Sequence, residues 1–305
     1  MQLRRLDPLA NAGPYQRLMS NPVKSMSLSE AQYERVKASR PQPIVTDGEA
    51  AVIGLPLGDF LEVHYAFPDI EMFVERFPAM FEEVVGASSK DEVPRGLIIT
   101  FRDRPNRMTA DTVFWSMALD QGEQWVEMNL VAVPEQPEPG RDLGDGYELV
   151  QAGAGDDDAL REVERAVTGR PALTAQGLQS LRDNSKLLGI ARSKQGGEAV
   201  GLVSLRTEPG GWGVIDLALL KEGAASQRKA LFQWSVAWLR NNGGRRVRKR
   251  CGVDDTAELS ALKGLGFTPG EAGLYLTRSV DKAEVEAKLA ERKSHGTIIK
   301  FGDWR

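Results

Sequence analysis

The stretch that most constrains the fold is residues 212–242, where an apolar strand leads through a short turn into a long helix. Residues 213–220 form an almost continuous apolar run, as expected for a strand that is covered on both faces. The helix is expected over 226–242, with Ser226 in position to cap its first turn. A strand that leads straight into a helix start directs main-chain N–H groups at one point, a geometry that binds phosphate groups.

The composition argues against several classes of function. The chain has 305 residues, enough for two domains, with 41% hydrophobic and 27% charged residues. The 39 basic and 43 acidic side chains give a net charge of −4, so there is no general attraction for nucleic acid or acidic membranes. A lone cysteine, Cys251, excludes an internal disulfide and a cysteine-rich metal site. Two distant histidines, His64 and His295, give no reason to expect a metal site either.

The lack of recognisable targeting segments favours a cytoplasmic location. The N-terminus lacks the apolar core of a signal peptide, and no window approaches the roughly 20 apolar residues that a membrane span needs. A single thiol suits a reducing compartment. We therefore expect a cytoplasmic protein with no membrane partner.

Proline, glycine and periodicity divide the chain into five segments. Residues 1–44 are expected to be an N-terminal helical extension, and 45–134 a first compact unit. Residues 135–146, rich in proline and glycine, are expected to be a linker. A second unit should span 147–280, and 281–305 should be a tail that docks on the fold.

The first unit is expected to combine strands with one aromatic helix. That helix should begin at Pro68 and run to about Gly86, and Pro78 should kink or divide it. Strands are expected over 49–55, 60–67, 97–101, 112–118 and 125–133.

The second unit should have the element order β-α-α-β-β-β-α-β-α-β. Its crossover helices, expected over 226–242 and 256–265, require some parallel strand pairing. In the tail, a helix over 282–293 is expected to precede a short strand over 297–301, and one way for the tail to dock is by adding this strand to the sheet of the first unit.

This order resembles the GNAT superfamily of acyl-CoA-dependent N-acetyltransferases. The residues that carry the likeness are Gly201–Leu205, Ile215–Leu220, Lys229–Phe232, Val253–Asp255 and Ala261–Phe267. The resemblance covers about 147–280, and the first unit is similar to a diverged second copy. It implies an α+β fold of two fused GNAT-like units, each a mixed, mostly antiparallel sheet with helices on both faces.

The resemblance also implies where acetyl-CoA would bind. The family's signature loop has Arg or Gln, two residues, Gly, one residue, then Gly or Ala, and its backbone wraps the CoA pyrophosphate. Residues 223–228 occupy that place, with Ser226 and Arg228 where the family has small residues. The candidate cofactor-binding residues are Leu219, Leu220, Ala225, Ser226, Gln227, Arg228, Lys229 and Ala230. Arg228 could donate to the pyrophosphate or fill its place.

Two carboxylates are candidates for the general base. Asp216 is the acidic residue inside the apolar run, and Glu208 lies across the neighbouring hairpin. For Asp216 the alternative is a strand carboxylate that faces solvent or bonds to a neighbour. Where many members of the family place a tyrosine as the acid, this chain has Leu262, and Tyr275 is out of register with it.

A dense basic run, Arg245–Arg250, has three interpretations. It could be a strand face exposed to solvent, a site for the 3′-phosphate of CoA, or a nucleic-acid contact. Alternation favours the first, with Val247 and Cys251 on one face and Arg246, Arg248 and Arg250 on the other. Nucleic-acid binding is disfavoured because no aromatic residues are interleaved.

The sequence thus favours an N-acetyltransferase that transfers an acetyl group to a primary amine of a small molecule or peptide entering between the two units. The alternative is a non-catalytic GNAT-like protein that binds a ligand or partner through degenerate cofactor loops. Homo-oligomerisation and the identity of the acceptor stay open.

Overall fold

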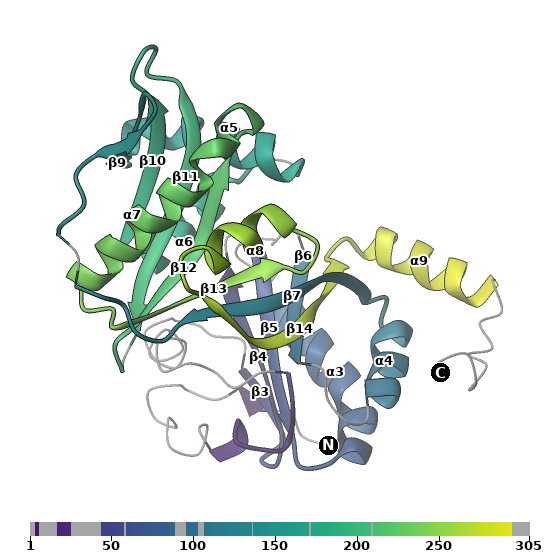
Figure 1. Ribbon diagram of the computed structural model, residues 1–305. Helices are drawn as coiled ribbons and strands as arrows, with labels where there is room; N and C mark the ends of the chain where they lie inside the picture. The colour runs from purple at the N-terminus through teal and green to yellow at the C-terminus, as the bar shows by residue number, and fades with distance from the viewer. Residues whose placement is uncertain are drawn as a thin grey trace.

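A computed structural model describes residues 4–5, 17–25, 44–57, 59–88, 96–102, 107–135, 137–170, 172–208 and 210–294 of the chain. Figure 1 shows two halves joined by three central strands, β13 (Arg246–Gly252), β7 (Asp120–Leu130) and β14 (Thr268–Ser279). The strands form one continuous sheet in the order β1-β3-β4-β5-β6-β14-β7-β13-β12-β11-β10-β9-β8, with β2 paired to β5. No helix in the described ranges is long and apolar enough to cross a bilayer.

In the first half, one of the predicted strands is replaced by a helix. Its elements are β1 (Arg4–Arg5), β2 (Val23–Lys24), β3 (Ile44–Thr46), β4 (Ala51–Leu57), β5 (Phe60–Phe67), α3 (Ile70–Ser88), β6 (Gly96–Arg102), α4 (Arg107–Ser116) and β7. The strand expected over 112–118 is wrong, because α4 occupies most of that stretch. Val113 and Phe114 are buried there, and the Phe114 ring lies 5.8 Å from that of Phe73 on α3. Tertiary packing thus outweighs the local strand preference of the Thr-Val pair.

Helix α3 runs through Pro78 as one element, so of the two expected effects, a kink or a division, the division does not occur. Its inner face is aromatic: Phe73 and Phe77 stack at 4.9 Å, and Tyr65 of β5 lies 5.1 Å from Phe73. Burying several aromatic side chains on one helix face offsets the hydrogen bond that a proline removes.

The second half follows the predicted order. Its elements are β8 (Asp142–Gly144), β9 (Tyr147–Gln151), η1 (Ala154–Asp156), α5 (Asp157–Thr168), α6 (Ala175–Asn184), β10 (Leu187–Ser193), β11 (Ala199–Glu208), β12 (Trp212–Leu220), η2 (Glu222–Gln227), α7 (Arg228–Asn241), β13, α8 (Thr256–Lys263) and β14, followed by α9 (Lys282–Ser294). The helix expected before residue 41 and the strand expected over 297–301 lie outside the described residues.

The two halves repeat one plan and share their last strands. β4-β5-α3-β6-α4-β7 matches β11-β12-α7-β13-α8-β14 in order and type. In both copies the parallel pair is the one that the crossover helix joins, β5 with β6 and β12 with β13. β14 lies between β6 and β7, and β7 lies between β13 and β14. The expected α+β class of two fused, mostly antiparallel units is confirmed, and the units are joined in one sheet.

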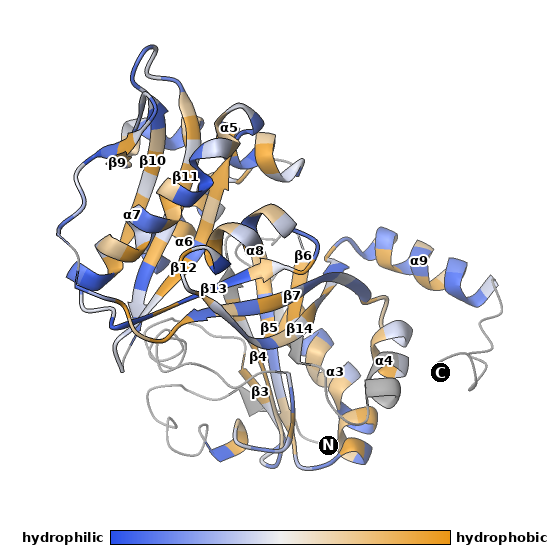
Figure 2. Ribbon diagram, in the orientation of Figure 1, coloured by the Kyte–Doolittle hydropathy of each residue, from blue (hydrophilic) through white to orange (hydrophobic). Residues whose placement is uncertain are grey.

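Helices cover both faces of the second half. α7 and α8 bury Phe232 and Leu262 against strand residues such as Val203. α5 and α6 cover the opposite face, where Leu160 packs in a cluster with Leu202. Consecutive residues of β11 therefore supply the two cores, as alternation in a strand requires. In Figure 2, β13 and much of β7 carry hydrophilic colours between these apolar regions.

A polar clamp joins α6 of the second half to the first half. Asp59, in the β4–β5 turn, accepts a hydrogen bond from the main-chain N–H of Thr174 at 3.0 Å and another from its hydroxyl. Thr174 is the N-cap of α6, and its hydroxyl oxygen accepts from the N–H of Gly177. The turn packs so closely on the helix that a Cβ at Gly177 would overlap the Asp59 carboxylate.

Gly177→Ala should therefore destabilise the protein by about 1–3 kcal/mol, the usual cost of overpacking a buried contact. Chemical denaturation followed by circular dichroism measures it. Gly155→Ala is the matched control, because a Cβ there meets nothing within 4 Å. Equal midpoints for the two variants would contradict the close packing of α6 on the turn.

Candidate functional site

The candidate site begins where β12 and β13 part. The two strands pair in parallel from Trp212 with Arg246 to Ile215 with Lys249, and no further pair forms between them in the described part of the chain. β12 nevertheless continues to Leu220. Residues 213–215 are buried and 216–219 are half-buried, so the strand loses cover where the pairing ends.

A β-bulge on the other edge of β12 accompanies this parting. Ser204 opposes Leu217 and Leu205 opposes Ile215, so Asp216 is the inserted residue. Bulges bend a strand and re-aim its side chains, and they are frequent next to functional sites. Asp216 thereby lies at the level where β12 leaves β13.

The loop at the mouth of the gap differs from the expected helix start. The 3₁₀ turn η2 occupies Glu222–Gln227, and α7 begins at Arg228, not at Ser226. Ser226 does not cap the helix; the N-cap position is Gln227, whose side chain makes no capping bond. Instead the Gln227 amide donates to Asp145 Oδ2 at 2.9 Å. The main-chain N–H of Arg228 donates to the Ala225 carbonyl, so it is not free for a phosphate group.

The predicted cofactor-binding residues divide into exposed and buried groups. Ala225, Ser226 and Lys229 are exposed on the outer side of the turn. Leu220 is buried in the core under α7, and Leu219 packs towards α5 and α6. Ala230 lines a hollow between α7 and the linker.

Arg228 spans the mouth of the gap. Its Nη1 lies 3.1 Å from Oδ1 and 2.9 Å from Oδ2 of Asp255. Asp255 is the N-cap of α8 and accepts a hydrogen bond from the N–H of Glu258 at 2.8 Å. The pair therefore links the first turns of α7 and α8, the helices that follow the two parting strands.

A row of alternating charges lies on the sheet face opposite α7. Arg206 Nε donates to Asp216 Oδ2 at 2.7 Å, and Arg206 and Arg248 both bond to Glu208. Arg248 Nη1 lies 3.9 Å from Glu127. Burial lowers the pKa of Arg206, but the carboxylates of Asp216 and Glu208 outweigh it and raise the pKa overall.

This row corrects the solvent-exposed interpretation of the basic run. Arg246, Arg248 and Arg250 do share one face, as the alternation predicts, but they are half-buried. The guanidiniums of Arg246 and Arg250 lie 4.5 and 4.9 Å from the ring centroids of Trp212 and Trp125 respectively. The aromatic partners come from other strands, which is why the basic run itself lacks them.

At the junction of the halves the row continues into a buried cluster. Glu62 Oε2 lies 3.2 Å from His64 Nε2, and Glu62 Oε1 accepts from the Thr100 hydroxyl at 3.0 Å. Burial would raise the pKa of Glu62, but His64, Arg250 and the Thr100 hydroxyl lower it to about 2. Burial raises the pKa of Tyr275, which lies 6.3 Å from Trp125 between ring centroids.

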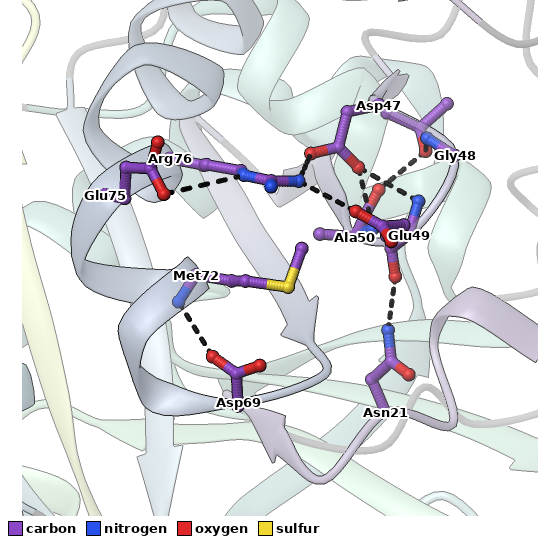
Figure 3. Close-up of polar contacts among 10 residues, drawn as sticks. Asn21, Asp47, Gly48, Glu49, Ala50, Asp69, Met72, Glu75 and Arg76 are labelled. Carbon is purple, nitrogen blue, oxygen red and sulfur yellow. Dashed lines mark hydrogen bonds and ion pairs between the residues drawn. The ribbon is translucent and has the colours of Figure 1, made fainter. Parts of the chain in front are cut away.

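The corresponding helix start in the first half has a different character. β5 ends at Phe67 and α3 begins at Ile70, which leaves no room for a loop. Asp69 Oδ1 accepts from the Met72 N–H at 2.8 Å, so a carboxylate occupies the place where an anion would bind. Figure 3 shows this start beside Arg76, whose Nη1 bonds to Asp47 at 2.7 Å and Glu49 at 3.0 Å.

Cys251 has no place in this chemistry. It is buried, and burial together with the charge of Glu258 raises the pKa of its thiol to about 12. At neutral pH the residue therefore behaves as a small apolar side chain.

Asp216, Glu208 and Arg228 can be singled out as candidates from the sequence, but their partners cannot. Arg206 and Arg248 belong to period-two patterns that a sequence shows, yet only strand register brings them to Glu208. Asp255 stands out in the sequence only as part of the GNAT-like segment Val253–Asp255, with no sign that it pairs with Arg228. Tyr275 stands out in the sequence only as a tyrosine out of register with the family's acid, and nothing local links it to Trp125, because the two residues lie on strands far apart in the chain.

The ionised Glu62 should make the protein acid-sensitive. Because its pKa falls from 4.5 to about 2 on folding, it stabilises the fold fully above pH 4.5 and loses that effect as the pH falls towards 2. Glu62→Gln should thus lower the urea midpoint strongly at pH 6 and much less at pH 3. The exposed Glu71→Gln serves as the control, and a cost of Glu62→Gln that does not vary with pH would contradict the assignment.

No protein-family model matches the chain, and no curated protein matches it. Solved structures do. A GCN5-related N-acetyltransferase (GNAT) from Sphaerobacter thermophilus is 18% identical with a TM-score of 0.62, over 92% of this chain and 95% of that one. A tandem GNAT protein from the clavulanic acid biosynthesis pathway is 14% identical with a TM-score of 0.56, over 92% and 98%. A putative acetyltransferase from Pyrococcus horikoshii is 10% identical with a TM-score of 0.55, over 91% and 89%.

These likenesses span nearly the whole of each chain and include the tandem arrangement. At such low identity they establish architecture, and the residues of the site must carry any statement about chemistry. The chain therefore has the fold of the GNAT superfamily, in its two-unit form.

Proposed function

We propose that this chain is an acetyl-CoA-dependent N-acetyltransferase whose second half binds the cofactor. The observation that carries the proposal is the gap between β12 and β13, with η2 and the first turn of α7 at its mouth. The edge of β12 beyond its last pair with β13 offers main-chain donors and acceptors to an extended, amide-containing chain such as pantetheine. Acetyl-CoA would supply the acetyl group as a thioester.

The residues at the mouth fit the phosphates of CoA. Ala225 and Ser226 are small and exposed, so they leave room for a bulky anion. Lys229 adds an exposed cation, and Arg228 keeps the Nη2 and Nε edge of its guanidinium clear of the Asp255 contact. In the first half, the Asp69 carboxylate argues against a second cofactor site.

We place the acceptor amine on the sheet face that carries the charged row, between the two halves. Asp216 lies at the bulge beside the gap, and its side chain is 32% exposed. A carboxylate there can accept the proton that an ammonium must lose before it attacks a thioester. Glu208 is 6% exposed and bonded to two guanidiniums, so its role is to hold Arg206 and Arg248.

Acetyl-CoA should raise the melting temperature of the protein, because a ligand of the native state stabilises it by mass action. Ser226→Glu should weaken that binding by about tenfold or more, since it places a carboxylate beside the phosphates. Thermal-shift titration of the full-length protein measures both effects.

Ala287→Glu adds the same charge on the exposed face of α9 and is the control. No shift for the wild type at millimolar acetyl-CoA would reject the enzyme and favour the non-catalytic GNAT-like binding protein.

Asp216→Asn should lower kcat/KM about 10²-fold while leaving acetyl-CoA affinity unchanged, because general-base catalysis typically contributes 10²–10⁴-fold. Thiol release with a panel of primary amines measures the rate. Glu208→Gln should instead lower the melting temperature, because it leaves two half-buried guanidiniums without their carboxylate. An Asp216→Asn enzyme with the wild-type rate would remove Asp216 as the base.

A further inference from the structure

Arg228 stands where the GNAT signature loop has Gly or Ala, and in the structure it forms an ion pair with Asp255. The two residues follow different strands: Arg228 opens α7 after β12, and Asp255 caps α8 after β13. Their contact joins the helix starts that follow the two parting strands. The contact is therefore tied to the geometry of the gap and not to either helix alone.

Asp255 engages one corner of the guanidinium. Both of its oxygens lie within 3.1 Å of Nη1, and its Oδ1 also accepts from the Glu258 N–H, which fixes the carboxylate on the helix end. A guanidinium has five N–H donors in a rigid fork, and Nη1 carries two of them. The Nη2 and Nε donors form the edge that binds a phosphate in bidentate fashion.

The side chain is partly open to solvent. Arg228 is 26% exposed, and its Nη2 and Nε make no hydrogen bond with any residue that the structure describes. Long cationic side chains lose considerable rotamer entropy when they bind an anion. A carboxylate that holds the guanidinium in place before binding removes much of that cost.

We propose that Asp255 is a positioning residue that holds Arg228 ready for the pyrophosphate of the cofactor. This proposal rests on the proposed function. A small residue at this position would let the backbone approach the pyrophosphate. Arg228 contacts the pyrophosphate with its side chain instead. The arrangement accounts for an arginine where the resemblance predicts glycine or alanine, and for the aspartate that accompanies it.

Three ligands distinguish which phosphate Arg228 meets: CoA, dephospho-CoA, which lacks the 3′-phosphate, and pantetheine, which lacks all phosphates. Isothermal titration of the full-length protein gives each affinity without any turnover. Arg228→Ala should weaken CoA and dephospho-CoA alike, by about 10- to 100-fold for lost charge-assisted hydrogen bonds, and leave pantetheine unchanged.

Two substitutions separate the positioning role of Asp255 from its capping role. Asn and Ser are both good N-caps, so Asp255→Asn and Asp255→Ser should preserve α8 and the melting temperature. Both should weaken CoA by about three- to tenfold, because Arg228 must then be ordered on binding. Asp255→Ser should add no further loss in an Arg228→Ala background, since it acts through Arg228.

Asp69→Asn provides the matched control, as the same substitution at the helix cap of the first half. It should leave CoA affinity unchanged. If the wild type binds neither CoA nor dephospho-CoA, the proposed function itself fails. If it binds both and Arg228→Ala binds as well or better, Arg228 is a plug and the proposal is wrong.

Two further results would also overturn the proposal that Asp255 positions Arg228 for the pyrophosphate. Tighter CoA binding by Asp255→Ser would mean that Asp255 competes with the phosphates for Arg228. A loss confined to CoA and absent with dephospho-CoA would assign Arg228 to the 3′-phosphate.

Discussion

Continuous main-chain hydrogen bonding through β14 and β7 is the constraint on which the rest of the structure depends. Because β14 lies between β6 and β7, the first half cannot complete its sheet until the last strand of the second half is in place. The halves are therefore not independent modules on a linker, and their relative orientation is set by strand register. The clamp between Asp59 and Thr174 adds a second connection between the halves.

The charged side chains on the shared sheet must find partners within the protein. The central strands carry arginines and glutamates that pair across strands: Arg248 of β13 lies between Glu208 of β11 and Glu127 of β7, and Arg250 also lies near Glu127. Breaking one member of such a row is costly, because it leaves an uncompensated charge in a half-buried place. The row thus stabilises the junction and also gives the second half a charged surface beside its gap.

The internal repeat explains why only one half has a candidate cofactor site. Both halves have a parallel strand pair whose members are joined by a crossover helix. In the second half, six residues of 3₁₀ turn separate strand from helix and leave small and cationic side chains outside. In the first half, the helix follows almost directly and begins on the Asp69 carboxylate. The same backbone plan thus leaves the helix start open in the copy where we propose the cofactor site, and places a carboxylate at the helix start in the other.

The sequence by itself determined the α+β class, the element order of the second half and the position of the strand–turn–helix, because hydrophobic periodicity and turn residues are local properties. It also marked Asp216, Glu208 and Arg228 as unusual. Only the tertiary structure decided that 112–118 is mostly helical, that the arginines of the basic strand form ion pairs with glutamates of neighbouring strands, and that Arg228 contacts Asp255. These features depend on which strands become neighbours, and a strand exchanged between halves leaves no trace in local pattern.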